Sequence, residues 1–211
     1  MHEEVSLVAF EPVDASFFGQ PTLELARSLL GMLLVKETEA GTASGWIVET
    51  EAYIGPGDRA AHSYNNRRTA RTDVMFGPAG HAYTHVMHTH CLLNVVSGDV
   101  GHPEGVLIRA LEPCTGIELM ANRRGQVKKK QELTNGPGKL TKALGIRMDD
   151  YRRPLFERPL FIAEGRGVEF ISSGPRVGID NSGEAKDYPW RFWDAGSPFV
   201  SKNAVRKTKM I

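Results

Sequence analysis

The hydrophobic and polar positions near the start of the chain follow two periods, one helical and one extended. Between Pro21 and Gly31 the apolar residues fall on one helical stripe, with proline suited to the first turn and glycine to the end. Residues 32–38 are mostly apolar and predict a buried strand, Gly41 marks a turn, and residues 45–53 predict the partner strand. The pattern therefore predicts a packing helix followed by a β-hairpin.

The rest of the chain predicts shorter elements separated by loops. Strands are expected at 81–96, with a turn or hairpin tip near 87–90, at 105–111, and near 159–163, 176–179 and 190–193. Short helices are expected at 117–124, where Thr115 and Glu118 have capping-box spacing and Gly125 is the stop, and from Asn135 to Gly145. Residues 55–80 predict a long ordered loop, which in compact domains is commonly functional, and residues 125–133 predict a mobile basic loop.

The chain has 211 residues, enough for one large domain whose core needs neither disulfides nor metals. Its two cysteines form no CxxC pair and favour a reducing compartment. No apolar run approaches the roughly 18 residues of a membrane span, and the first residues lack the form of a signal peptide. We therefore expect a soluble cytoplasmic protein.

The formal net charge of +1 does not by itself predict nucleic-acid binding, but the cationic residues are clustered. The clusters are Arg67, Arg68 and Arg71; Arg123, Arg124, Lys128, Lys129 and Lys130; and Lys202, Arg206, Lys207 and Lys209. Such patches can follow phosphates even on a neutral protein. The alternative is an ordinary charged surface or a frayed tail, which we favour for the last cluster.

The stretch from Val48 to Tyr53 carries the densest candidate chemistry. Strand alternation assigns Ile47, Glu49, Glu51 and Tyr53 to one face, and Trp46, Val48 and Thr50 to the other. His62 follows after a Gly-Pro loop. A carboxylate beside flat, weakly polar rings suits a site that holds a planar molecule and directs a water at it. The alternative is that the two acids lie on a solvated outer face.

Five of the seven histidines lie close together, at positions 81, 85, 88, 90 and 102. A metal site would need a fixed ligand spacing and further ligands, and no HExxH motif is present, so polar or stacking histidines at a loop tip are favoured. Gly136–Lys139 is too short for a Walker loop but could hold one phosphate at a helix start. The chain also lacks the glycine motif of dinucleotide-binding folds and the GxSxG motif of serine hydrolases.

Several ordered motifs extend from about Phe17 to Ser201. They are Val48–Tyr53, Asp58–Ser63, Arg68-Thr69, Met75-Phe76, Asn94-Val95, Val106–Pro113, Asn135–Leu140, Pro175–Ile179, Arg191–Trp193 and Gly196–Pro198, together with the helix at 23–31. In this order they resemble the alkyladenine (3-methyladenine) DNA glycosylase family, the mammalian-type family also found in bacteria.

The resemblance implies an α+β fold: a single compact domain over residues 1–211, with a curved, mostly antiparallel, open-barrel-like β-sheet surrounded by helices. The first 15 or so and last 10 or so residues are expected to be flexible. The implied activity is monofunctional excision of alkylated or deaminated purines, namely 3-methyladenine, 7-methylguanine, hypoxanthine and ethenoadenine. The implied partner is double-stranded DNA with damaged purines. No metal, cofactor or covalent intermediate is implied, and we expect a cytoplasmic, nucleoid-associated monomer.

Matching motif positions imply specific roles. Glu51 is expected to be the general base that activates water, with Glu49 as the competing acid, and Arg109 is expected to position the water or Glu51. Tyr53 and His62 are expected to stack on the extruded base, and Asn94 to reject guanine through its exocyclic amine. The residues expected at phosphates are Arg67, Arg68, Thr69 and Lys139.

The chain departs from the family pattern at Tyr83–His90, where many members carry Tyr-x-Tyr-x-x-Tyr-Gly. His85 replaces the stacking tyrosine, and His88 falls where another tyrosine wedges into the duplex. Three alternatives remain at this point. They are a damage-recognising DNA-binding module without catalysis, a histidine-metal hydrolase, and a bifunctional glycosylase whose amine nucleophile is Lys139.

Overall fold

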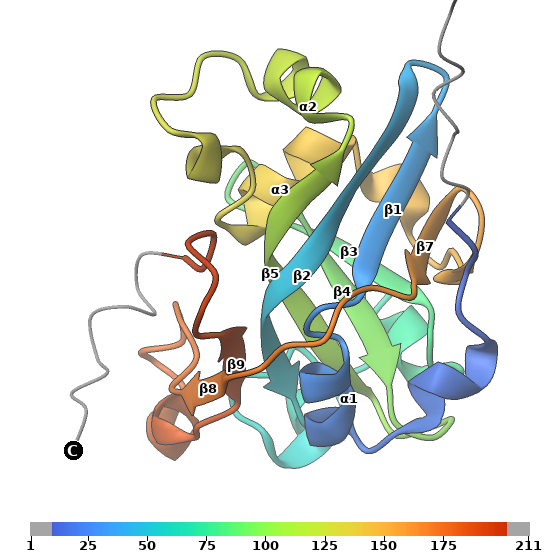
Figure 1. Cartoon of the computed structure of the whole chain (residues 1–211). Coiled ribbons are helices and arrows are strands. Elements are labelled where there is room, and N and C mark those ends of the chain that lie inside the picture. Colours follow the sequence, from blue (N-terminus) through green and yellow to red (C-terminus); the bar gives the residue numbers. More distant parts are fainter. Residues whose placement is uncertain (1–9, 202–211) are drawn as a thin grey trace, which may run out of the picture.

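A bent antiparallel β-sheet runs the length of the molecule and is flanked by short helices (Figure 1). The computed structural model describes residues 10–201. Its strands are β1 (Leu33–Thr38), β2 (Gly41–Tyr53), β3 (Ala82–Met87), β4 (His90–Ser97), β5 (Glu104–Thr115), β6 (Phe156–Glu157), β7 (Leu160–Ala163), β8 (Ile171–Gly174) and β9 (Arg191–Asp194). The order along the sheet is β3-β4-β5-β2-β1-β7-β6, with β9 joined to β2 and β8 to β9. The sheet curls into a half-barrel, which confirms the predicted α+β class and curved, antiparallel core.

The long strand β2 lies at the centre of this sheet. One of its edges pairs with β5, while the other pairs first with β1 through residues 41–46 and then with β9 through residues 49–51. The register against β5 shifts between Ile47 and Glu49 and again between Glu49 and Thr50. Such irregularities bend a strand and increase its twist, so they let β2 leave β1 and meet β9.

These register shifts also change which side chains share a face. Ile47 and Ala52 both belong to the main hydrophobic core, whereas Glu51, the strand neighbour of Ala52, must point to the opposite face. Val48 joins a separate cluster with Trp193, away from Thr50, whose hydroxyl donates to the carbonyl of Ala26. The predicted alternation is therefore wrong at Ile47 and Val48, because a bulge interrupts it.

Three α-helices are present among the described residues: α1 (Thr22–Ser28), α2 (Ile117–Arg124) and α3 (Pro137–Leu144). Helix α1 covers one face of β2, and α3 packs against α2 and β4. The close approach of α3 to β4 requires Gly138, because a Cβ atom there would lie 2.6 Å from Cβ of His90. The predicted helices and their glycine stops, Gly125 and Gly145, are confirmed.

Several predicted local features are wrong. No capping box forms before α2: Thr115 belongs to β5 and bonds Ser44, while Gly116 is the N-cap without a side-chain bond. Residues 176–179 form no strand, and β8 lies earlier in the chain. The loop at 55–80 contains three short 3-10 turns, and the basic loop contains another at Lys130–Leu133.

The chain ends divide into described and undescribed parts. Within the N-terminal segment expected to be flexible, the backbone N–H of Val13 donates to the carbonyl of Ile162, and Ala15–Gly19 form a 3-10 turn. Residues 10–15 are therefore held against β7, which corrects that part of the expectation. The expected flexible C-terminus and the cluster from Lys202 to Lys209 lie outside the described residues, as do residues 1–9.

Candidate active site

A pocket of about 320 Å³ opens between the end of β2, the β3–β4 hairpin, β5 and the segment 178–182. Its lining is Tyr53, Arg59, Ala60, His62, Met75, Tyr83, His85, Met87, Leu92, Asn94, Gly105, Leu107 and residues 178–182. The size and the mixture of aromatic walls with a few polar groups are typical of small-molecule sites. Four residues predicted from sequence to contact a base, Tyr53, His62, His85 and Asn94, are thus brought together here.

Glu51 lies directly behind the Tyr53 wall of this pocket. The Tyr53 hydroxyl donates to Glu51 Oε2 at 2.8 Å, and the backbone N–H of Val177 donates to Glu51 Oε1 at 2.7 Å. Arg109 Nη1 lies 3.2 Å from the same Oε1. The Glu51 side chain has no exposed surface, so the alternative of a solvated outer face is wrong.

Glu49 is equally buried but has different partners. Arg109 Nε donates to Glu49 Oε1 at 2.8 Å, and Ser201 donates to both carboxylate oxygens, from its backbone N–H at 2.7 Å and its hydroxyl at 2.9 Å. Arg191 Nη1 lies 3.7 Å from Glu49 Oε1. Neither Glu49 nor its direct partners line the pocket. Arg109 therefore connects two carboxylates, only one of which adjoins the pocket.

Burial and neighbouring charges shift the pKa values of several groups in this buried network. Burial acts to lower the pKa of Arg109, but the negative charges of Glu51 and Glu49 outweigh it and raise that pKa. Burial is the main cause that lowers the pKa of Arg191, against the opposing pull of Glu49. The pKa of Tyr53 is raised well above its usual value by burial and by Glu51. Tyr53 therefore stays a protonated donor to the carboxylate.

The rings of Tyr83, His85 and His62 contact each other and form one wall of the pocket. The ring of His85 stacks on Tyr83, with centroids 5.1 Å apart and planes 26° apart. His62 meets His85 edge-on at 4.7 Å, and its Nδ1 hydrogen-bonds the Tyr83 hydroxyl at 2.7 Å. His85 thus joins the aromatic wall, and it is held there by two other rings.

Asn94 controls the orientation of this wall. Its Nδ2 donates to the carbonyl of Tyr83 at 3.1 Å and lies 3.3 Å from His85 Nδ1. An amide NH2 cannot accept, so Nδ1 of His85 is the acceptor in this arrangement and the imidazole is neutral, with its proton on Nε2. That buried Nε2 has no hydrogen-bond partner among the described residues.

Both pocket histidines are neutral near physiological pH. Burial, with the nearby charges of Arg71 and Arg67, lowers the pKa of His62 to about 4. Burial, with His62 and Arg71, lowers the pKa of His85 to about 4 as well. Burial also raises the pKa of Tyr83 to about 12. The pocket wall consequently presents neutral rings, while cationic residues lie close behind it.

A buried ion pair, Asp58–Arg176, braces the pocket and was not predicted from sequence. Both side chains have no exposed surface, and the guanidinium binds the carboxylate through two nitrogens. Arg176 also donates to the carbonyls of Ala52 and Ala185 and lies 4.7 Å from the centroid of the Tyr53 ring. Arg176 therefore ties the loop before His62 to the end of β2 and to the 176–185 segment.

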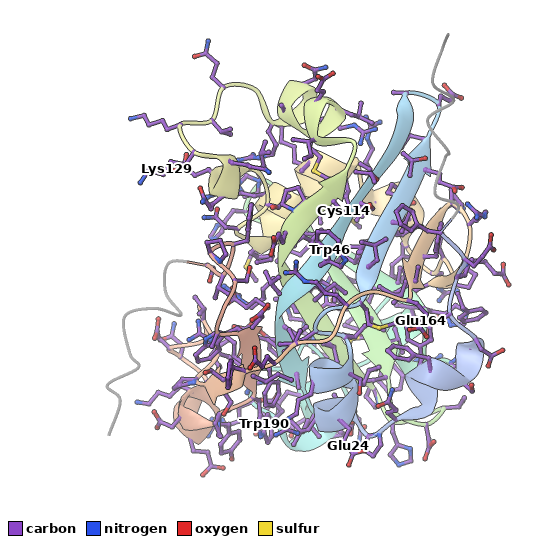
Figure 2. All side chains as sticks on the ribbon, viewed as in Figure 1. Glu24, Trp46, Cys114, Lys129, Glu164 and Trp190 are labelled. Atoms are coloured by element: carbon purple, nitrogen blue, oxygen red, sulfur yellow. The ribbon has the colours of Figure 1, made fainter. Side chains whose placement is uncertain are left out.

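The other face of Arg176 is closed by Trp190, whose ring centroid lies 5.0 Å from the guanidinium. Figure 2 shows Trp190 beside β9, at the end of the molecule where β2 terminates. In the sequence, Asp58 and Pro175–Ile179 are visible as motif members, yet nothing in their spacing indicates that they pair. The signal that could have found the pair is that a cation buried among apolar residues needs a charged partner.

The predicted phosphate contacts lie outside the pocket. Arg67, Arg68 and Thr69 are exposed, and the effect of Arg67 on His62 places its charge near the pocket. Arg68 is already engaged, because its Nε donates to Asp73 at 2.7 Å and its guanidinium lies over Phe76. The backbone N–H of Thr69 is bound by the Thr72 hydroxyl, so it organises the turn.

The predicted wedge, His88, sits at the tip of the β3–β4 hairpin. It is exposed and has a positive φ of 54°, which places it in the tight turn. Its neighbours Val86 and Met87 are 51% and 45% exposed, and Met87 lines the pocket. The structure thus brings an apolar residue, Met87, to the pocket mouth beside His88.

Lys139, the remaining predicted phosphate contact, lies at the start of α3 and donates to Asn135 at 2.8 Å.

The clustered histidines do not form a metal centre in the described part of the chain. No group of three or more His, Cys, Asp or Glu side chains there could hold a metal ion. His81 bonds backbone carbonyls of its own turn, His85 lies in the pocket wall, and His102 lines a different cavity.

Among residues 10–201, no helix is long and apolar enough to cross a membrane.

A buried carboxylate beside an aromatic pocket is an arrangement that suits an enzyme site for a small molecule. Comparison with known proteins makes this class specific. The family model described as methylpurine-DNA glycosylase matches residues 16–198. The chain therefore belongs to the methylpurine-DNA glycosylase family, which confirms the resemblance and the enzyme class, a DNA glycosylase that hydrolyses N-glycosyl bonds.

Individual relatives agree with the family match. The chain is 64% identical over 194 residues to a protein of Bacillus licheniformis, covering 92% of this chain and 98% of that one. It is 62% identical over 191 residues to a Bacillus subtilis protein, covering 90% and 97%, and 58% identical over 193 residues to one from Oceanobacillus iheyensis, covering 92% and 97%. All three carry the name "Putative 3-methyladenine DNA glycosylase".

Proposed function

We propose that this protein is a monofunctional 3-methyladenine DNA glycosylase. It extrudes a damaged purine from duplex DNA and hydrolyses its N-glycosidic bond with a water activated by Glu51. The observation that carries this proposal is the placement of Glu51: fully buried, bonded to Tyr53 and Arg109, and directly behind an aromatic pocket. Family membership and the names of its relatives support the same activity.

The buried carboxylate suits the chemistry of glycosidic bond cleavage. The bond breaks through an oxocarbenium-like state, and a nearby carboxylate stabilises that positive charge while it activates the attacking water. Glu51 is fully covered in this form, so a water reaches it only if the Tyr53 or Val177 hydrogen bond opens. We place that opening at substrate binding, when the base enters beside Tyr53. Arg109 then keeps the carboxylate oriented.

The pocket wall suits damaged purines. Electron-poor or cationic purines bind well between aromatic rings, and here Tyr53 and the His62–Tyr83–His85 wall supply neutral faces. Damaged bases pair poorly, which lowers the cost of extruding them. The proposed substrates are 3-methyladenine, 7-methylguanine, hypoxanthine and ethenoadenine. The NH2 group of Asn94 donates to the Tyr83 carbonyl and lies beside His85, which holds the side chain in the pocket wall, where we propose that it rejects guanine by crowding the exocyclic amine at the purine 2-position.

We propose that the hairpin tip enters the duplex beside the extruded base. Apolar side chains at such tips fill the gap left in the base stack. Met87 has the exposure, the apolar character and the contact with the pocket mouth, while His88 forms the turn that presents it. The proposed phosphate contacts are Arg67, Thr69 and Lys139, with Arg68 available only if its bond to Asp73 opens.

The decisive experiment offers duplexes with hypoxanthine, ethenoadenine or methylated purines and measures the released base, with and without chelator. We expect release that chelator does not affect. Binding without release would favour a damage-recognition module, and loss of release with chelator would favour metal hydrolysis. Borohydride trapping of the protein on DNA would favour an amine nucleophile such as Lys139.

A single glycosylase domain over residues 1–211 and a monomeric state complete the proposal. A DNA substrate further supports a cytoplasmic, nucleoid-associated location. Sedimentation of the enzyme with and without a lesion duplex tests the monomer directly, because a second copy per duplex would double the protein mass in the complex.

A further inference from the structure

A second, cation-lined cavity of about 440 Å³ lies beside the β3–β4 hairpin, which also lines the base pocket. It is lined by Thr89, His90, Cys91, Arg123, Gly138, Thr141, Lys142, Gly145, Ile146 and Arg147. Met87 of the pocket mouth and His90 of this cavity are paired residues across the hairpin, so their side chains share one face of it. The two cavities are therefore neighbours along the same hairpin.

The lining of this cavity is unbalanced in charge. It includes Arg123, Lys142 and Arg147, and no aspartate or glutamate. Elsewhere in residues 10–201 many cations have acidic partners, for example Arg158 with Glu37, but none of these three has an ion pair. Asp150 accepts from the backbone N–H of Arg147 at 3.0 Å, and its carboxylate is paired with Lys36 at 2.5 Å and with Arg153 at 3.0 Å.

Arg123 is held rigidly at the base of this cavity. Its guanidinium donates to the carbonyl of Leu144 at 2.7 Å and to the Thr38 hydroxyl at 2.8 Å. Burial and the neighbouring charge of Arg147 lower the pKa of Arg123, which shows that the two cations repel each other there. An anion between them removes that repulsion. Lys142 and Arg147 are exposed and can close on such a ligand.

The position of the cavity is also fixed relative to the hairpin. The hydroxyl of Thr141 in α3 donates to the carbonyl of Cys91 in β4 at 2.7 Å, and Gly138 touches His90. Helix α3, which carries Lys142, is therefore attached to the hairpin. A tip placed in DNA carries the cavity to the sugar-phosphate backbone beside it.

We propose that this cavity binds a phosphate of the DNA duplex, with Lys142 and Arg147 as its ligands and Arg123 as the fixed charge behind them. The inference rests on the proposed function, because it takes the hairpin tip to be in the duplex. The site carries no base information, since a phosphate contact positions a protein without reading sequence. It secures the hairpin on the duplex backbone.

The test is the salt dependence of binding to undamaged and hypoxanthine duplexes, for wild type and for a Lys142→Ala/Arg147→Ala variant. The slope of log K against log salt is negative, and each lost phosphate contact makes it shallower by about 0.9. We expect the variant to bind both duplexes more weakly, with slopes that are shallower by about 1 to 2. The control is Arg158→Gln/Arg166→Gln, which removes two surface cations that already have acidic partners and should leave the slope unchanged.

An unchanged slope in a variant with wild-type melting temperature overturns the phosphate site. The single variant Lys142→Gln keeps the test valid if the double variant melts early. If inorganic phosphate raises the melting temperature of wild type but not of the variant while the DNA slopes agree, the cavity takes free phosphate and the DNA proposal is wrong. Absence of base release by wild type from every lesion duplex would instead defeat the proposed function.

Discussion

Glu49 and Glu51 lie two residues apart on one strand, are both fully buried and share Arg109, yet their surroundings differ. Glu49 is closed in by Ser201 and Arg191, whereas Glu51 is bonded to Tyr53 and Val177 at the edge of the pocket. The first arrangement anchors the chain after β9 to the sheet. The second leaves the carboxylate one side chain away from a ligand. Identical chemistry therefore serves structure in one case and, as we propose, catalysis in the other.

The sharpest way to test this comparison is Glu51→Gln. The amide keeps the shape but cannot accept a proton from water, so we expect excision to fall by about 10²- to 10⁴-fold while lesion DNA is still bound. Single-turnover base release and a binding titration measure the two effects. Excision near the wild-type rate would show that Glu51 is not the base.

Arg109→Met removes the cation common to both carboxylates. Two buried acids then lose a charge partner, and breaking such a pair costs about 3–5 kcal/mol of unfolding free energy. We expect this loss in denaturant unfolding, together with a large loss of excision. Arg109→Lys is the control, because it keeps the charge but lacks the planar fork of the guanidinium and should restore stability only in part. Stability equal to wild type in Arg109→Met would contradict the shared role.

Glu49→Gln separates the two acids. Its hydrogen bonds from Ser201 and Arg109 weaken, so we expect a loss of about 1–3 kcal/mol in unfolding free energy. Because Glu49 does not adjoin the pocket, excision below the melting transition should stay within about tenfold of wild type. The reverse result, with stability kept and excision lost, would exchange the roles of Glu49 and Glu51.

The smallest expected effect concerns pH. Unfolded histidines take up a proton near pH 6.5, whereas His62 and His85 in the folded protein do so at a pKa of about 4. The unfolded state therefore binds more protons between these values, and stability should fall as pH drops through that window. His85→Phe removes one such group and should flatten the decline in melting temperature between pH 6.5 and 4. An equally steep decline would mean that His85 is already charged when folded.

Much of the site could be predicted from sequence because its residues lie in short motifs. Glu51, Tyr53 and Arg109 occupy predictable strands, and the buried stretch around them has clear extended character. The Asp58–Arg176 pair could not be predicted, since its members are far apart in sequence and lie in loops without a period. Met87 was overlooked for a similar reason: its exposure depends on where the hairpin turns.

The amino-acid sequence by itself determined the three helices, the order of the strands from β1 to β5, the carboxylates of β2 and the family to which the chain belongs. These are local properties, set by periodicity, turn residues and contiguous motifs. Only the tertiary structure decided which carboxylate adjoins the pocket, that a bulge moves Ile47 to the opposite face, and that one hairpin lines both an aromatic pocket and a cationic one. The physical reason is that side-chain orientation and burial depend on strand register and long-range packing, which no local pattern contains.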